Sequence, residues 1–168
     1  KLAILASLAF HTRVRPEDVH REGIGGLAAR DFLYARELGY AIKLLAIARR
    51  EDSAIQARVH PALVPEEELL AKVDGALNAI QIEGDLTGRI LFQGAGAGSL
   101  PTTSAVMADV LDAARAVVQG GRPFPWRYTA EVSIKPLAEL VTRYYIRLEV
   151  ADRPGVLAGI ARAFGDHG

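Results

Sequence analysis

Three glycines within five residues, Gly94, Gly96 and Gly98, constrain the fold of this chain more than any other stretch. The apolar run at residues 89–93 predicts a strand before them, and the pattern at residues 104–118 predicts a helix after them. A strand, a glycine-rich turn and the start of a helix present backbone N–H groups to a ligand, because glycine has no side chain to hold the ligand away.

The glycine turn matches neither of two common nucleotide-binding motifs. No Lys-Ser/Thr pair follows it, and its spacing is G-x-G-x-G, whereas a dinucleotide fingerprint has G-x-G-x-x-G. Pro101 suits the first turn of the following helix, and Thr102 or Thr103 is a candidate N-cap. The spacing alone therefore predicts either a loop that contacts a ligand or a tight connection between packed elements.

Composition limits the class of protein. The chain has 168 residues, half of them hydrophobic, which is enough for one domain, or for one domain and part of another. The formal net charge of zero argues against nucleic acid or an acidic membrane as the main partner. There is no cysteine, and four scattered histidines lack ligand spacing, so we expect no metal site. No apolar run reaches the roughly 20 residues that cross a bilayer, and a cytoplasmic protein is expected.

Four strands with short links are predicted at residues 40–48, 55–60, 76–83 and 87–92. The first is apolar on nearly both faces, which indicates a central position in a sheet. Helices are predicted at residues 1–10, 28–38 and 66–73, and the first has almost no polar face, so we expect it to be buried. The predicted fold class is α+β, a mixed β-sheet with helices packed on one face.

The composition changes after residue 119. A Gly- and Pro-containing stretch starts a linker over residues 120–142, and residues 143–150 alternate as a strand. The sequence D-R-P-G-V-L at residues 152–157 then turns into a helix. Together these elements make half of a βαββαβ unit, which is not a stable domain by itself. The uncapped start of the first helix adds to the expectation that the chain is a fragment of a longer protein.

Taken together and in order, four stretches resemble the homoserine dehydrogenase family. They are K-L-A-I-L at residues 1–5, E-L-G-Y-A-I-K-L-L-A-I-A at 37–48, R-V-H-P at 58–61, and the glycine turn with its Pro101-Thr102 exit. The D-R-P-G-V-L stretch resembles the start of an ACT domain, a regulatory module that bacterial members carry. The resemblance implies three parts: the catalytic and dimerisation domain at 1–119, the linker at 120–142, and the truncated start of an ACT domain at 143–168.

The resemblance also implies roles for individual residues. Members of this family interconvert L-aspartate 4-semialdehyde and L-homoserine with NAD or NADP, in threonine and methionine biosynthesis. Lys1 matches the family's lysine beside the reacting oxygen, where an ammonium group stabilises negative charge and transfers a proton. Without the resemblance, the sequence would indicate only a frayed terminal residue at Lys1. Gly98 matches the glycine that contacts the nicotinamide nucleotide, and Gly94 and Gly96 shape the approach to it.

Parts of the family's pattern are absent from this chain. The nucleotide-binding Rossmann domain, the carboxylates that hold homoserine and the hinge that binds a monovalent cation are not in the sequence, so the isolated chain is expected to be inactive. The resemblance further implies a homodimer or higher homo-oligomer formed through the sheet. It implies an effector site for an amino acid such as threonine at Asp152, Gly155 and Leu157. Two alternatives stay open, an amino-acid-sensing ACT module and a structural dimerisation domain.

Overall fold

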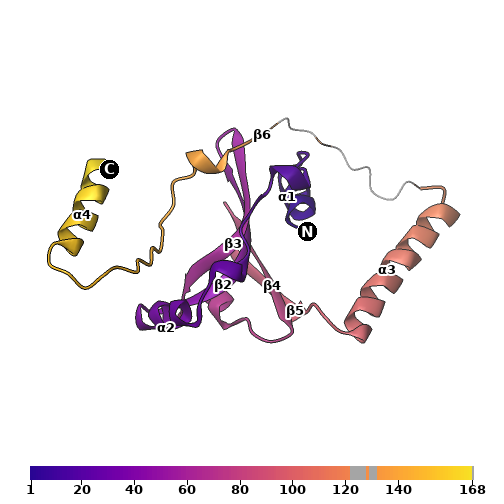
Figure 1. Cartoon of the computed structure of the whole chain (residues 1–168). Helices are drawn as coiled ribbons and strands as arrows, with labels where there is room; N and C mark the ends of the chain where they lie inside the picture. The colour runs from indigo at the N-terminus through magenta and orange to yellow at the C-terminus, as the bar shows by residue number, and fades with distance from the viewer. Residues whose placement is uncertain (122–127, 129–131, 168) are drawn as a thin grey trace.

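The computed structural model describes residues 1–121, 128 and 132–167 (Figure 1). Its main sheet is built on a long antiparallel hairpin of β2 (Tyr40–Glu51) and β3 (Ala54–Pro65). β1 (His20–Arg21) and β6 (Ser133–Ile134) both pair in parallel with β3, so the sheet is mixed and β3 lies inside it. The predicted α+β class and mixed sheet are confirmed.

The predicted central position of the first strand is wrong, because β2 forms an edge of this sheet within the described residues. The apolar side chains of β2 are half-exposed, and Leu44 is exposed, so the doubly apolar pattern does not reflect burial between strands. β3 is also longer than expected, since it runs through Pro61 to Pro65. Pro61 and Pro65 each lie an even number of residues after Ile55, so their backbone groups face the same side of β3 as those of Ile55. The carbonyl of Ile55 accepts the N–H of Lys135 and so faces away from β2. Neither proline therefore needs an N–H group for the hairpin.

Helix α1 (Leu2–Phe10) covers one face of the sheet. Leu2, Ala3 and Ala6 pack with Ala57 of β3 in the main core cluster. The expectation that this helix is buried is confirmed for one side only, because Ile4 on the other side is 67% exposed. Only one side of α1 faces the sheet, and its small alanines allow the helix to approach the strands closely.

Helix α2 (Ala29–Glu37) confirms the predicted helix before the sheet, and Gly39 follows it with a positive φ of 80°. Three-residue 3-10 turns occur at Pro16–Asp18, Ile24–Gly26 and Leu137–Glu139. The helix predicted at residues 66–73 is only a 3-10 turn, Leu69–Lys72. Lys43 holds the connection after it, since its Nζ lies 2.9 Å from the carbonyl oxygen of Val73.

The second hairpin, β4 (Leu77–Gly84) and β5 (Gly88–Ala95), pairs as a sheet of its own. The two predicted strands are therefore present but do not extend the first sheet. Helices α3 (Ser99–Val118) and α4 (Val156–His167) stand apart from both sheets (Figure 1). The strand predicted at residues 143–150 is wrong, because this segment has no ladder partner within the described part of the chain.

Candidate functional site

Lys1 lies at the N-cap position of α1, and its carbonyl oxygen accepts the N–H of Leu5 at 3.1 Å. Its side chain is exposed, while Leu2 and Ala3 directly after it are buried against the sheet. The position of Lys1 is therefore set by a firmly packed helix. At such an N-terminus the backbone N–H groups add positive potential to that of the ammonium group.

The glycine turn joins β5 to α3. β5 includes Gly94 and ends at Ala95, and the N–H of Gly96 donates to the carbonyl oxygen of Ala76 at 3.3 Å. The helix begins earlier than predicted, at Ser99, so Gly98 is its N-cap and no side chain caps it. The proposed caps Thr102 and Thr103 are wrong, because both lie inside the helix. Pro101 does stand in the first turn, as expected.

The three glycines differ in what they require. A Cβ atom at Gly94 would meet nothing within 4 Å, so a ligand can approach the backbone there. A Cβ atom at Gly96 would lie 1.7 Å from Nδ2 of Asn78. Gly98 has φ 127° and ψ 153°, a combination that is essentially restricted to glycine. The turn therefore offers bare backbone and the N–H groups that start a 20-residue helix.

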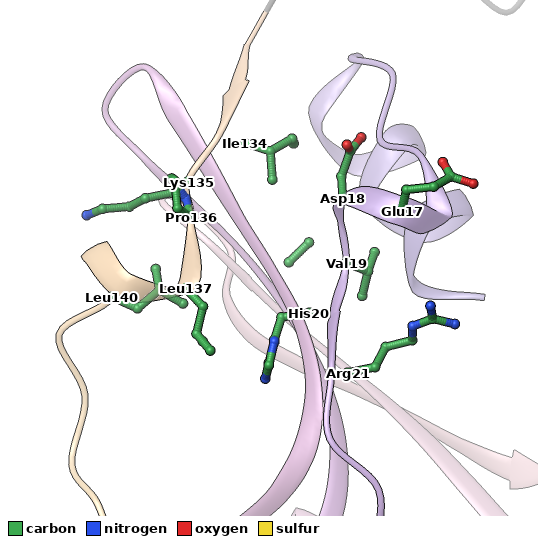
Figure 2. A pocket seen from close by; sticks show the side chains of 11 residues that line it. Glu17, Asp18, Val19, His20, Arg21, Ile134, Lys135, Pro136, Leu137 and Leu140 are labelled. Carbon is green, nitrogen blue, oxygen red and sulfur yellow. The ribbon is translucent and has the colours of Figure 1, made fainter.

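The candidate residues do not form one enclosed site. Among the described residues, no hydrogen bond or ion pair joins Lys1 to the glycine turn. A cavity of about 510 Å³ lies elsewhere, between the β1 region and residues 134–140 (Figure 2). Its lining includes the charged residues Glu17, Asp18, Arg21 and Lys135 and the imidazole of His20. Lys135 is already paired with Glu51 at 3.1 Å, and neither Lys1 nor any of the three glycines lines this cavity.

The expected effector residues lie at the start of α4. Gly155 has a positive φ of 88° and directly precedes the helix, and its carbonyl oxygen accepts the N–H of Gly159 at 3.0 Å. Asp152 is exposed, and Leu157 is 79% exposed. The D-R-P-G turn therefore has the geometry of a helix start, and the positive φ of Gly155 explains why this position favours glycine.

The sequence pattern missed a cluster around a buried carboxylate on α2. Oδ1 of Asp31 lies 3.2 Å from the hydroxyl of Tyr145 and 3.2 Å from a guanidinium nitrogen of Arg147. Oδ2 accepts the N–H of Ala28 at 2.7 Å. This backbone hydrogen bond first, and then Arg147, Tyr145 and Arg30, hold the pKa of Asp31 below its usual value, although burial opposes them.

Two local patterns in the sequence contribute to this cluster, although neither of them points to the other. Asp31 sits in the first turn of a predicted helix, where a carboxylate caps the preceding N–H. Tyr145, Arg147 and Glu149 alternate along residues 143–150, so they share one side of an extended segment. Only the three-dimensional structure brings the two patterns together, since they are 114 residues apart.

Within residues 1–121, 128 and 132–167, no group of three or more histidine and carboxylate side chains is placed to hold a metal ion. In the same ranges, no helix combines the length and the apolar character that crossing a membrane requires.

The chain is similar to known enzymes over nearly its whole length. Residues 1–111 match the family model described as homoserine dehydrogenase. The homoserine dehydrogenase of Mycobacterium leprae is 49% identical over 98% of this chain and 38% of its own length. That of Corynebacterium glutamicum is 47% identical over 100% of this chain and 39% of its own length. The chain thus spans about two fifths of the length of these curated relatives.

Solved structures agree with the sequence matches. The crystal structure of a homoserine dehydrogenase from Thiobacillus denitrificans has a TM-score of 0.82 and 42% identity, over 99% of this chain and 40% of that one. A Staphylococcus aureus homoserine dehydrogenase structure at pH 7.5 has a TM-score of 0.64 and 37% identity, over 74% of this chain and 30% of that one. These relatives are oxidoreductases. The chain belongs to the homoserine dehydrogenase family.

Proposed function

We propose that this chain is the substrate-side and dimerisation part of an NAD(P)-dependent homoserine dehydrogenase. The reaction interconverts L-aspartate 4-semialdehyde and L-homoserine in a cytoplasmic route to threonine and methionine. The observation that carries the proposal is the similarity over 98–100% of the chain to enzymes of this name. The open glycine turn and the lysine at the start of α1 support the roles that the family resemblance implies.

Lys1 is proposed as the proton donor and acceptor. When bound, the nicotinamide cofactor supplies a hydride to the aldehyde carbon, and the carbonyl oxygen then needs a proton to become the alcohol. The Lys1 ammonium can stabilise the developing negative charge and give up that proton. In the reverse direction, the neutral amine removes the proton from the hydroxyl of homoserine.

The glycine turn is proposed to contact NAD or NADP through its backbone. The open space beside Gly94 and the bare N-cap at Gly98 fit a group that approaches the main chain closely. The absence of a Lys-Ser/Thr pair and of the G-x-G-x-x-G spacing fits a secondary contact rather than the main nucleotide site. Most cofactor contacts are proposed to come from another part of the enzyme.

A homodimer is proposed to form through the exposed sheet surfaces. The second hairpin has an exposed apolar face of cross-strand neighbours, with Ile80 opposite Phe92 and Ile82 opposite Ile90. Such a face is a candidate contact for a second copy. Sedimentation velocity is expected to give a species of twice the 18.0 kDa chain mass, and a purely monomeric species would contradict this part.

An amino acid such as threonine is proposed to bind near Asp152, Gly155 and Leu157. The support is the D-R-P-G-V-L resemblance, together with the positive φ of Gly155 at the start of α4. Isothermal titration of threonine into the protein of the relatives' length tests this part. Loss of the binding heat in Gly155→Val is expected, whereas binding of equal strength by the variant would contradict the assignment.

The central experiment uses the protein of the relatives' length that carries this chain. Homoserine-dependent reduction of NAD or NADP is measured for the wild type and for Lys1→Ala. Because proton transfer acts in the transition state, kcat is expected to fall about 10²–10⁴-fold with a much smaller change in KM. An unchanged kcat with only a raised KM would make Lys1 a binding residue. The 168-residue chain alone is expected to show no such reduction.

A further inference from the structure

Residues 143–150 are attached to α2 by polar contacts on one side only. Tyr145, Arg147 and Glu149 alternate along this extended segment and face α2. The hydroxyl of Tyr145 and the guanidinium of Arg147 reach the carboxylate of Asp31, and Arg30 pairs with Glu149 at 2.6 Å. The Arg30–Glu149 pair is solvent-exposed and contributes little. Asp31, at 3% exposure, is therefore the main attachment point.

The other side of the same segment is apolar and exposed. Tyr144, Ile146, Leu148 and Val150 alternate with the residues that contact α2 and are all exposed, with Tyr144 at 73%. Within the described residues this segment has no strand partner, so no ladder of backbone hydrogen bonds holds it. Among the described residues, the contacts that hold it are those that its side chains make with α2.

Asp31 uses its two oxygens for different purposes. Oδ2 accepts the N–H of Ala28, which closes the first turn of α2. Oδ1 receives Tyr145 and Arg147 from the distant segment. Because both contacts share one rigid carboxylate, a rotation that breaks one set also disturbs the other. α2 in turn packs against β2 and leads into it through Gly39.

We propose that Asp31 anchors a docking surface on α2 for residues 143–150, and that release of this segment loosens the first turn of α2. The docked segment and the helix start form one two-state unit. A force or partner that draws residues 143–150 and α4 away thus acts on α2 and the adjoining strand. The similarity to the Thiobacillus denitrificans structure extends over 99% of the chain and so includes both elements. The inference does not depend on the reaction proposed above.

The first test compares two neighbouring tyrosines in the protein of the relatives' length that carries this chain. Tyr145→Phe removes only the hydroxyl that reaches Asp31, and Tyr144→Phe is the matched control on the exposed side. Hydrogen–deuterium exchange followed by mass spectrometry reports both regions separately. Tyr145→Phe is expected to raise exchange several-fold in residues 143–150 and also in residues 28–32. Tyr144→Phe is expected to match the wild type in both.

The second test removes the charge. Arg147→Gln is compared with Arg143→Gln, whose arginine is exposed and has no contact with Asp31 among the described ion pairs. Arg147→Gln is expected to raise exchange in the same two regions, and Arg143→Gln in neither. Asp31→Asn is expected to give the largest effect, because it weakens the helix cap and the docking contact together.

Two results would overturn the proposal. If Tyr145→Phe and Tyr144→Phe exchange alike, Asp31 does not anchor the segment. If Tyr145→Phe and Arg147→Gln raise exchange in residues 143–150 but leave residues 28–32 unchanged, the segment docks on α2 through Asp31. The proposed coupling of its release to the first turn of α2 is then wrong. Both variants retain the Asp31 carboxylate that accepts the N–H of Ala28 in the wild type, so the outcome does not depend on whether Asp31→Asn folds.

Discussion

The side chain of Asn78 occupies the space that any side chain at Gly96 would need. An added Cβ at Gly96 would lie 1.7 Å from Nδ2 and 2.4 Å from Cγ of Asn78. The same glycine donates its N–H to the carbonyl oxygen of Ala76 at 3.3 Å, so the glycine turn lies against the start of β4. Any larger residue at position 96 thus displaces the exposed side chain of Asn78, whatever the turn contacts outside the chain.

Gly96→Ala is expected to destabilise the chain by about 1–3 kcal/mol, because the added methyl group displaces Asn78. Urea unfolding measures this cost. Gly94→Ala is the matched control, since the space around Gly94 is open. Adding Asn78→Ala to Gly96→Ala is expected to recover part of the loss. Equal stability of the Gly96 and Gly94 variants would show that the Asn78 contact is not restrictive.

Gly98→Ala is expected to cost about 1–3 kcal/mol of stability without any ligand, because φ 127° is unfavourable for alanine. Backbone strain lowers stability without any ligand, whereas blocked approach of the cofactor raises only the cofactor KM. In the protein of the relatives' length, Gly94→Ala is expected to leave thermal stability unchanged and to raise the cofactor KM. A Gly98→Ala variant with wild-type stability would mean that the backbone between β5 and α3 adjusts to the alanine without strain. A Gly94→Ala variant with wild-type cofactor KM would mean that the turn only connects a strand to a helix and does not contact the cofactor.

Ser7→Ala is expected to destabilise the core by about 1–3 kcal/mol. Oγ of Ser7 accepts the N–H of Val14 at 2.9 Å and donates to the carbonyl oxygen of Ala3 at 2.7 Å. Alanine leaves the buried N–H of Val14 without this partner. Ser53→Ala, in the exposed turn between β2 and β3, is the control and is expected to change stability little. Chemical denaturation of both variants decides the point, and equal midpoints would contradict it.

Local patterns predicted the elements well because local physics decides them. Gly39 ends α2, and alternation in residues 55–60 marks β3. The patterns failed where distant segments decide. The apolar residues on both faces of β2 predict a central strand. The strand order, however, depends on β1 and β6, which have only two residues each and no hydrophobic pattern of their own. Residues 143–150 read as a strand, but a strand also needs a partner.

The candidate site divides in the same way. The glycine turn could be predicted because glycine spacing is a local signal. In the structure, the contact with Asn78 favours glycine at position 96, and the positive φ favours glycine at position 98. The role of Lys1 came only from the family resemblance, because one exposed lysine has no distinguishing pattern. The Asp31 cluster could not be predicted, since its partners come from residues 145 and 147 and their contact depends on the path of the intervening chain.

The Asp31–Tyr145 contact is expected to have a stability window bounded by pH on both sides. The N–H of Ala28 and then Arg147, Tyr145 and Arg30 lower the pKa of Asp31. Its contribution is complete above the unfolded pKa of about 3.9 and is lost as the pH falls through the lower folded value. Burial and then Asp31 raise the pKa of Tyr145. That contribution is complete below about pH 10 and is lost as the pH rises through the higher folded value.

The window is measured as the urea midpoint against pH. The pKa of Glu51 is also lowered, by Gln56 and Lys135, so the acid limb of the wild type contains more than one group. The difference between the wild type and Asp31→Asn isolates Asp31 and is expected to shrink progressively below about pH 4. The carboxylate of the unfolded chain is protonated first, and the difference is lost once the pH falls through the lower folded pKa. Likewise, the difference between the wild type and Tyr145→Phe is expected to shrink above about pH 10. Differences that stay constant across both limits would mean that neither group titrates with a shifted pKa in the folded chain.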